Sequence, residues 1–454
     1  MTVADKTKAM ANPTKAFFVR MITRDISLED CILDLIDNSV DGAWRSEGSR
    51  PMGLAQDADL SDYSIDIIAN DRLFSISDNC GGMTLDDAAD HAFSFGRRSM
   101  DQHDDYSIGV YGIGMKRAVF KIGAEINITS TYGAAGTRES FSVPINVDTW
   151  LNNDVPPWDF DIVDAAHLDQ NGVSIVVERL TSGASSSFSS PAFLQELRRT
   201  IARDYSLHLS RGLKISLNEI PIVGWKIELL EGAAFSPMRL QYDDETDGDP
   251  VSVEIFGGMA APPPESSDPD AEDDGERRFG WYVICNGRIV LAADKTNLSG
   301  WGTEDWPQWH RQYSGFIGII LFTAAKAAAL PLTTTKRNVD KSSEVFRRAR
   351  PRMREVTRQW IDYTNQRKTS LEEAKKIEVA AAPVSIYAVK QQATVQLPTF
   401  APKPPAERMA NINYAIPLAR LKKVAKELGG INLSYRDVGV KTFEYTYEDL
   451  VGDE

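Results

Sequence analysis

The sequence predicts an α+β protein made of several structural units. Segments with helical and strand periodicity alternate along its first half, and 454 residues are enough for about three units at roughly 150 residues each. The 42% hydrophobic and 25% charged residues are typical of an ordinary globular protein. A collagen, a coiled coil and a wholly disordered chain are therefore excluded.

The first predicted helix covers residues 25–43 and carries two stripes. One stripe is apolar and follows helical spacing through Leu28, Ile32, Leu35, Ile36, Val40 and Ala43. The other stripe is polar, because Asp30, Asp34, Asn38 and Asp41 are separated by four, four and three residues. Its three like charges repel one another, and no lysine within the helix relieves them. Such a face is either solvated or functional.

A β-hairpin is predicted next, with strands at residues 63–69 and 73–77, and it ends at Asp78. A glycine-containing turn over residues 79–83 follows, and Thr84 is the expected N-cap of a helix from Leu85. Further strands are expected at residues 125–130, 139–147 and 173–177. The first unit is therefore α+β, and we expect it to span residues 1–225.

Gly109, Gly112 and Gly114 lie in a loop that opens another helix, and Lys116 follows them. Glycine lets backbone N–H groups approach a phosphate closely, and the N-terminus of a helix adds a favourable potential. This loop is therefore a candidate anion cradle, although a tight loop without a ligand would show the same glycines.

The second half of the chain divides by composition. Strands resume up to about residue 340 and are interrupted near residues 260–276 by an acidic, proline-rich insertion that we expect to be disordered. A long amphipathic helix is predicted over residues 341–380, a Pro-rich linker over 381–406, and a helical C-terminal segment over 407–454.

Several kinds of chemistry are disfavoured by the composition. Three cysteines cannot build a disulfide framework, which fits a cytoplasmic protein, and the five histidines lie too far apart for a zinc motif. The most apolar segment, residues 316–332, is too short to cross a membrane. The net charge of −15 argues against bulk coating of nucleic acid, although Arg347, Arg350, Arg354 and Arg358 form a local basic stripe on the long helix.

Three segments, in this order, resemble the ATP-binding motifs of the GHKL superfamily, which contains DNA gyrase B, HtpG-type chaperones, sensor histidine kinases, MutL and MORC proteins. They are residues 34–41 (DLIDNSVD), 78–83 (DNCGGM) and 108–116 (IGVYGIGMK). The resemblance extends over roughly residues 20–180 and implies that the first unit is an α/β sandwich, in which helices cover a mixed sheet. Each motif alone is compatible with a solvated face or a turn, but the ordered set favours nucleotide binding.

The resemblance implies a role for each matching residue. Asn38 would coordinate the Mg²⁺ that bridges the phosphates of ATP, and Asp78 would accept a hydrogen bond from the adenine amino group. The other residues expected to contact ATP are Asp41, Gly82, Met83, Gly109, Gly112, Gly114, Met115 and Lys116. Residues 96–107 would form the lid that closes over the nucleotide.

The chain departs from the family pattern at three positions. Asp34 replaces the glutamate that activates water in hydrolysing members, and a base displaced by about 1 Å can lose on the order of a hundredfold in rate. Cys80 replaces a glycine of the second motif, and Val173 stands where a threonine is usual. We therefore expect Asp34 to be catalytic but hydrolysis to be slow.

The second unit, residues 226–340, resembles the S5-like transducer domain of gyrase B, MutL, MORC and HtpG-like proteins. The resemblance rests on residues 280–290 (GWYVICNGRIV) and on the loop 330–338 (LPLTTTKRN), which would deliver a lysine to the γ-phosphate. Lys336 is the expected catalytic lysine, and Arg337 is the alternative.

The expected protein is a Mg²⁺-dependent ATPase in which ATP drives lid closure and homodimerisation. DNA or a partner protein is its possible target, in genome maintenance or antiphage defence. Two alternatives stay open: a nucleotide-gated interaction protein with little hydrolysis, and an HtpG-like chaperone.

Overall fold

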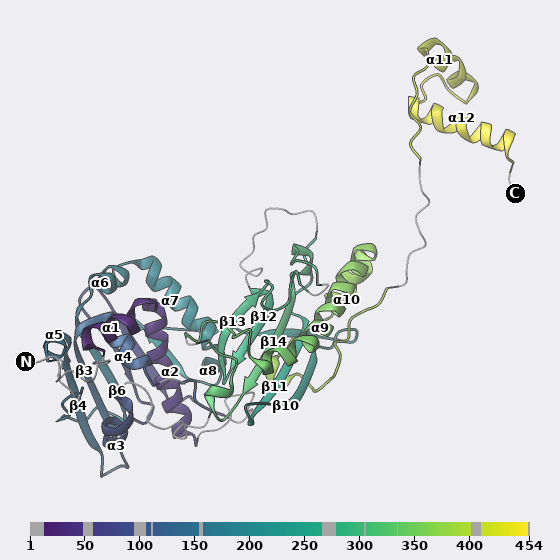
Figure 1. Ribbon diagram of the computed structural model, residues 1–454. Coiled ribbons are helices and arrows are strands. Elements are labelled where there is room, and N and C mark those ends of the chain that lie inside the picture. Colours follow the sequence, from purple (N-terminus) through teal and green to yellow (C-terminus); the bar gives the residue numbers. More distant parts are fainter. Residues whose placement is uncertain are drawn as a thin grey trace, which may run out of the picture. The chain divides into compact units, whose positions relative to one another are not determined.

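The computed structural model describes residues 13–48, 58–94, 106–109, 112–153, 158–265, 278–303, 306–333, 335–400 and 410–452 (Figure 1). The chain forms two compact units, Met1–Phe400 and Ala401–Glu454. The first unit contains two large sheets with helices packed on them, and the second contains two helices. The expected fold class, α+β with a helical C-terminal part, is confirmed.

The first sheet has eight strands in the order β5-β4-β3-β6-β2-β1-β7-β8. Their bounds are β1 Ser64–Ala69, β2 Phe74–Asp78, β3 Gly123–Tyr132, β4 Glu139–Asn146, β5 Val163–Asp164, β6 Gly172–Leu180, β7 Lys214–Leu217 and β8 Ile220–Pro221. The predicted hairpin is β1–β2, which pairs antiparallel with Ile65 opposite Asp78. Because β6 pairs with the other edge of β2, Asp78 ends a strand in the middle of the sheet.

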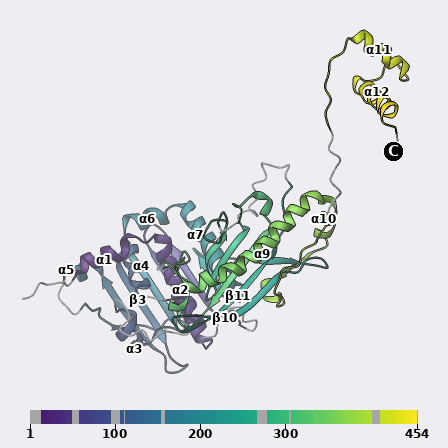
Figure 2. The same ribbon diagram turned by 45° about the vertical axis from the view of Figure 1, so that its right-hand side comes forward.

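Helices gather over one face of this sheet, as Figures 1 and 2 show. Their bounds are α1 Lys15–Arg24, α2 Leu28–Ser46, α3 Leu85–Asp87, the π-helix η2 Ala88–Ala92, α4 Gly114–Ile122, α5 Val147–Asn152, α6 Ser182–Phe188, α7 Pro191–Asp204 and α8 Ser206–Ser210. The predicted first helix is α2. Ser27 caps it by accepting a hydrogen bond from Asp30 N, and its apolar stripe is buried in the core.

The second sheet has five strands in the order β10-β11-β14-β12-β13. They are β10 Met238–Thr246, β11 Asp249–Met259, β12 Gly280–Cys285, β13 Arg288–Asp294 and β14 Phe316–Thr323, and β12 runs parallel to β14 while the other pairs are antiparallel. Helix α9, Glu344–Thr369, packs along β10, β11 and β14 (Figure 2). Strand β14 is buried on both faces, which explains its unbroken apolar sequence.

The structure differs from the sequence-based expectation in two parts of this second half, the long helix and the expected linker. The helix expected over residues 341–380 is divided at Ser370 into α9 and α10, Leu371–Glu378. A short 3₁₀ turn, η5 Ala327–Ala329, follows β14. The remaining short elements are 3₁₀ turns at Arg311–Tyr313 (η4) and Ile386–Ala388 (η6).

The segment expected as a linker is packed as far as Phe400. Strand β15, Ala382–Ser385, pairs with β9, Glu228–Glu231. Further bridges join Gln392 to Arg239 of β10 and Gln396 to Ser236, just before β10. Its apolar side chains complete the core under α9, and Phe400 is buried there. Proline content misled the prediction because a proline at a sheet edge needs no ladder partner for its missing N–H. The expected acidic insertion lies largely outside the described residues.

The second unit consists of helices α11, Leu418–Glu427, and α12, Tyr435–Leu450, which pack against each other. Ser434 caps α12 by accepting a hydrogen bond from Asp437 N. Across the part of the chain that the structure describes, no helix is long and apolar enough to cross a membrane.

The turn after β2 tolerates only glycine at position 82. Its φ is +76°, and a Cβ there would lie 2.1 Å from the carbonyl oxygen of Thr131. Gly82→Ala is expected to lower the free energy of unfolding by about 3 kcal/mol or more. Gly136→Ala is the matched control, because Gly136 has φ +92° and open space around its Cβ position. It is expected to cost only the backbone strain of about 1–2 kcal/mol. Urea unfolding measures both, and equal losses would contradict the steric argument.

Candidate nucleotide site

The middle of helix α2 is buried except at one polar position. From Cys31 to Trp44 every residue is buried apart from Asn38, which is exposed. No hydrogen bond to the Asn38 amide is found within the described residues. A core helix that presents a single unpaired amide to open space is suited to binding a ligand there rather than to packing.

Asp78, at the end of β2, is buried and firmly oriented. Its carboxylate accepts hydrogen bonds from the Ser39 hydroxyl at 2.6 Å, from Cys80 N at 2.9 Å and from Val173 N at 3.2 Å. Burial raises the pKa of Asp78, and these three donors oppose that effect. Ser39 directly follows Asn38 on α2. Its hydrogen bond to Asp78 therefore links the part of α2 that carries Asn38 to the end of β2.

Close backbone approaches hold the second motif against its neighbours. A Cβ at Gly42 of α2 would lie 2.8 Å from Cys80 O, and one at Gly172 of β6 would lie 1.9 Å from Asp78 O. Met83 N donates to the Ser130 hydroxyl, which in turn donates to Met83 O. The turn that carries Gly82 and Met83 is therefore fixed by α2 on one side and by β3 and β6 on the other. Cys80, where the family pattern has glycine, is accommodated as a buried side chain.

Asp41, one turn beyond Asn38, anchors the glycine loop to α2. Its two carboxylate oxygens accept hydrogen bonds from Ile108 N at 2.7 Å and from Gly109 N at 3.0 Å. Burial raises the pKa of Asp41 to about 7, although the two backbone donors favour its charged form. The acidic stripe of α2 is thus partly explained, because one of its carboxylates binds the backbone of the loop.

Helix α4 begins directly over Asp34. A Cβ at Gly114 would lie 3.3 Å from Asp34 Cγ, and no side chain caps the helix at Ile113. An uncapped N-terminus leaves backbone N–H groups available to an anion. Gly112, at φ +65°, makes the turn into the helix, and Met115 packs partly buried against the core. Residues 110 and 111 of the loop, and most of the expected lid, lie outside the described residues.

Lys116 turns back toward the segment that precedes the expected lid. Its buried ammonium donates to Ala92 O at 2.7 Å, to Ser94 O at 2.6 Å and to Gly112 O. It therefore joins the end of η2 to the turn before α4. This geometry is compatible with the sequence-based expectation that Lys116 lies near the phosphates, but it also gives the residue a structural task.

Asp34 is buried between two cations. Its Oδ2 accepts from Arg117 Nε at 2.7 Å and pairs with Arg117 Nη2 at 2.5 Å, while its Oδ1 lies 3.3 Å from Lys336 Nζ. Lys336 comes from the loop after β14, so the second half of the unit reaches the first motif. The structure thus brings together the two residues expected to be catalytic.

Asp37 is the second carboxylate that holds Lys336, at 2.8 Å. It also pairs with Arg288 at the start of β13 and accepts from the Tyr205 hydroxyl at 2.7 Å. Burial acts to raise the pKa of Asp37, but Arg288 and Lys336 outweigh it, so the pKa is lowered. Burial likewise acts to lower the pKa of Lys336, and Asp37 with Asp34 raises it. Asp37 and Lys336 are therefore both charged at neutral pH.

Arg337, the alternative to Lys336, makes a separate set of ion pairs. Its guanidinium contacts Glu29 at 2.9 Å, Asp204 at 3.4 Å, and Asp30. These partners lie at the start of α2 and the end of α7, and Asp30 is about one turn from Asp34. Arg337 thus binds the loop after β14 to partly exposed residues at the start of α2, while Lys336 contacts the buried carboxylates of the same helix.

The motif analysis missed four residues that shape this site: Arg117, Ser39, Asp37 and Arg288. Two of them adjoin predicted residues, since Arg117 follows Lys116 and Ser39 follows Asn38. Asp37 lies inside the first motif but outside the polar stripe, so helical spacing excluded it. Arg288 could not be found locally, because its partner Asp37 is 251 residues away.

Comparison with known families supports the geometry. Residues 26–172 match the family model described as histidine kinase-, DNA gyrase B- and HSP90-like ATPase. This segment is a GHKL-type ATPase domain. It contains α2, the β1–β2 hairpin and the glycine loop, so the sequence-based recognition of the family is confirmed. No match was found among curated proteins. The MORC- or MutL-like layout of the whole chain stays a prediction.

The raised pKa of Asp41 predicts a pH dependence of stability in the GHKL domain. Because the folded value of about 7 lies above the unfolded value of about 3.9, the folded protein retains a proton that the unfolded chain has lost between these values. The free energy of unfolding contributed by Asp41 therefore falls as the pH rises through this window and is constant above it. Its slope is at most ~1.4 kcal/mol per pH unit.

Urea unfolding of the wild type and of Asp41→Asn checks this dependence. The stability of the wild type relative to the variant is expected to fall between about pH 5 and pH 7 and to level off above. Asp41→Asn also loses one of the two hydrogen bonds that Asp41 accepts from Ile108 N and Gly109 N. This loss is the same at every pH, so it does not change the slope of stability against pH. A difference that is constant over the whole range would refute the assignment.

Proposed function

We propose that the chain binds ATP with Mg²⁺ between α2 and the glycine loop and hydrolyses it slowly. The GHKL domain implies ATP binding. The observation that supports the site is the combination of the exposed Asn38 amide, the oriented Asp78 carboxylate and the uncapped start of α4. These three groups match a metal, an adenine amino group and phosphates, respectively.

Base selection would come from Asp78. The hydrogen bonds from Ser39, Cys80 N and Val173 N fix the orientation of the Asp78 carboxylate, which remains a hydrogen-bond acceptor. An acceptor at this position selects the amino group of adenine over the carbonyl oxygen of guanine. Val173 cannot supply the hydroxyl that a threonine would, but the Ser39 hydroxyl already donates to Asp78. Gly82 and Met83 would form the floor beneath the base.

Asn38 is the residue that would hold Mg²⁺. Within the described ranges no group of three or more His, Cys, Asp or Glu side chains is arranged to bind a metal, so the remaining ligands would be phosphate oxygens and water. A bound Mg²⁺ would neutralise charge on the phosphates. Asp34 lies one turn before Asn38 on the same face of α2, which places its carboxylate next to the phosphate end of the site.

Hydrolysis requires a change in the ion pairs of Asp34. As general base it would accept a proton from the attacking water, and Oδ1 is the oxygen less firmly held, with Lys336 at 3.3 Å. A terminal phosphate that attracts the Lys336 ammonium would free this oxygen and would be stabilised by the same ammonium. Arg117 would remain on Oδ2 and keep the carboxylate in position.

A nucleotide-gated interaction protein with little turnover is the second candidate. The double pairing of Asp34 favours it, because both cations must be displaced or must reorganise before this carboxylate acts as a base. In either case a bound nucleotide would change the second sheet through the ion pairs that join it to α2. These ion pairs are made by Lys336, Arg288 and Arg337.

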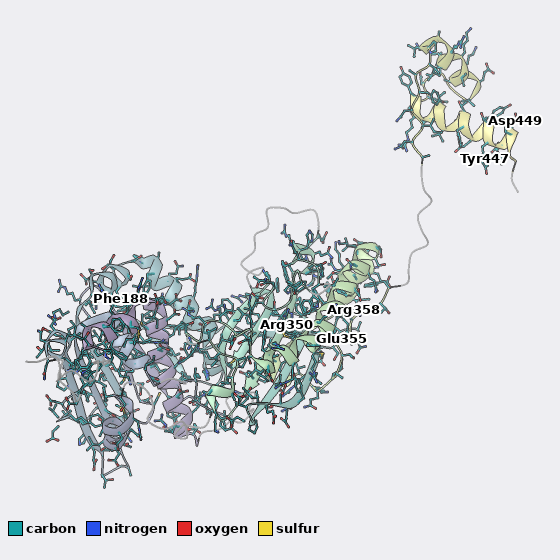
Figure 3. All side chains as sticks on the ribbon, viewed as in Figure 1. Phe188, Arg350, Glu355, Arg358, Tyr447 and Asp449 are labelled. Atoms are coloured by element: carbon teal, nitrogen blue, oxygen red, sulfur yellow. The ribbon has the colours of Figure 1, made fainter. Side chains whose placement is uncertain are left out.

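Lid closure, homodimerisation and a DNA-associated, antiphage or HtpG-like chaperone role are extensions of this proposal. Arg347 and Arg358 of α9 are exposed and Arg350 is half-buried, with Glu355 exposed among them (Figure 3). This mixed surface offers some support for a nucleic-acid partner, which would bind with a strong dependence on salt.

Isothermal calorimetry tests the site. ATP with Mg²⁺ is expected to bind the wild type. Asp78→Asn is expected to weaken binding at least tenfold, because the amide replaces one of the two acceptor oxygens of the carboxylate with an NH₂ donor, which cannot accept from the adenine amino group. Asn38→Ala is expected to weaken binding with Mg²⁺ more than binding without it. Asp71→Asn, at the exposed hairpin turn, is the control and should bind as the wild type. Absence of heat from folded wild-type protein would reject the proposed function.

Phosphate release tests the catalytic role of Asp34. Asp34→Asn is expected to lower turnover at least tenfold while ATP affinity changes less than about threefold, because the side chain would act on water rather than on the nucleotide. Asp34→Glu restores the usual length of the base and is expected to retain turnover. Thermal unfolding of both variants shows whether the buried ion pairs still support the fold. Equal turnover in the wild type and Asp34→Asn would favour the switch.

A further inference from the structure

The turn between β12 and β13 brings a buried amide side chain to the edge of the second sheet. Asn286 and Gly287 form this turn, with φ of +44° and +81°. Both values lie in the left-handed region, and an Asn-Gly pair is favoured where two antiparallel strands are joined by such a turn. The side chain of Asn286 is fully buried, so its amide has to find its partners within the protein.

One alanine fixes the plane of this amide. Asn286 Oδ1 accepts a hydrogen bond from Ala324 N at 3.0 Å, and Asn286 Nδ2 donates to Ala324 O at 3.0 Å. Because a backbone N–H can only donate, this pair also assigns which end of the amide is the oxygen and which is the nitrogen. The second hydrogen on Nδ2 is left for another acceptor.

That acceptor is the carbonyl oxygen of Ser107, at 2.9 Å. Ser107 directly precedes the two residues whose N–H groups donate to Asp41 of α2. A backbone hydrogen bond from Tyr106 N to Ala325 O, at 2.8 Å, adds a second contact with the same part of the second sheet. The start of the glycine loop is therefore held from two sides, by α2 and by the second sheet.

The chain contains a matched example of an asparagine at such a turn. Asn218, between β7 and β8, also has a positive φ, +50°. Its amide makes the same pair of hydrogen bonds with one alanine, since Ala69 N donates to Oδ1 at 2.8 Å and Nδ2 donates to Ala69 O at 3.0 Å. In both places the asparagine follows a strand that runs parallel to the strand at whose end the alanine lies.

The comparison of the two turns isolates one hydrogen bond. Among the described residues, the amide of Asn218 is bonded to Ala69 alone, and this residue is half-buried. Asn286 has the equivalent two bonds and a third one, to Ser107, which lies 179 residues earlier in the chain. The turn at Asn218 forms without a third bond, so the third bond of Asn286 serves the segment that it contacts.

We propose that Asn286 is a positioning residue of the nucleotide site, which holds the start of the glycine loop in the place where the loop binds phosphate. The inference rests on the proposed function, because it assumes that the phosphates of ATP lie at this loop. Lys336 would act on the terminal phosphate through its charge, whereas Asn286 would act through the backbone of the loop. The second sheet would thus contribute to the site in two independent ways.

Substitution by glycine tests this role without changing the turn. Asn286→Gly removes the amide and leaves a residue that adopts a positive φ at no steric cost. Asn218→Gly is the matched control, because it removes the equivalent pair of hydrogen bonds and none to the glycine loop. Both are made in the full-length chain and compared at a temperature at which thermal unfolding shows them to be folded.

A second pair of variants, Asn286→Asp and Asn218→Asp, covers the case in which a glycine variant does not fold. Aspartate also tolerates a positive φ, and it keeps an oxygen that accepts from the alanine N–H. It has no N–H to donate, so Asn286→Asp loses the bond to Ser107 O. The two measurements below apply to both pairs.

Hydrogen–deuterium exchange without nucleotide measures how firmly the loop is held. Peptides that contain residues 106–109 are expected to exchange about tenfold faster in Asn286→Gly than in the wild type, because local opening no longer has to break the bond to Asn286. In Asn218→Gly the same peptides are expected to exchange as in the wild type.

Calorimetry with ATP and with adenosine separates positioning of the loop from a general loss of structure. Asn286→Gly is expected to weaken the binding of ATP about tenfold, whereas the binding of adenosine, which has no phosphates, changes less than about twofold. Asn218→Gly is expected to change either affinity by less than about twofold, since none of its lost bonds reaches the loop.

Unchanged exchange of residues 106–109 in Asn286→Gly would overturn the inference and leave the proposed function intact. Equal losses of ATP affinity in the two glycine variants would do the same. Equal weakening of ATP and adenosine in Asn286→Gly would also overturn it, because a general loss of structure explains both. A folded wild type that binds no ATP would reject the proposed function, and the role of Asn286 in affinity with it.

Discussion

The buried ammonium of Lys336, placed between Asp34 and Asp37, is the interaction on which the organisation of the first unit depends. Removing three charged groups from water is costly, and their mutual attraction offsets the cost only when each has a partner of opposite sign at short distance. Arg117 pairs with Asp34 and Arg288 pairs with Asp37, so each carboxylate has a second cation beside Lys336. The first motif of the GHKL domain and the second sheet therefore share one charge cluster.

Lys336 itself adopts a left-handed backbone conformation, with φ +55°. For a residue with a side chain this costs on the order of 1 kcal/mol, and it persists only when surrounding contacts determine it. Here those contacts are the two carboxylates and the clamp of Arg337 on the outside of α2. A loop held in this way by charges at the nucleotide site is suited to respond when another anion enters that site.

The end of the proposed site at Asp78 depends on a different constraint, which is steric. Gly42, Gly82 and Gly172 allow backbones to approach at distances that any Cβ would prevent, and the turn after β2 is consequently fixed against three elements. Asp78 gains its direction from this packing as much as from its own hydrogen bonds. The end of the proposed site at the glycine loop is held more lightly. Asp41 accepts hydrogen bonds from the backbone of Ile108 and Gly109, and Lys116 donates one to Gly112 O. A turn fixed on three sides beside a loop held by fewer contacts is compatible with the proposed closure over a nucleotide.

The sequence by itself determined the elements whose signals are local. Helix α2, the β1–β2 hairpin, Asp78 at the strand end and the glycine-led start of α4 all follow from spacing and turn residues within about twenty residues. Asn38 could be singled out in the same way. Only the tertiary structure decided that Lys336 meets Asp37 across 299 residues, that Arg288 joins them, and that residues 382–400 pack as part of the first unit. A buried ion pair depends on which surfaces the fold brings together, and neither spacing nor composition along the chain records that.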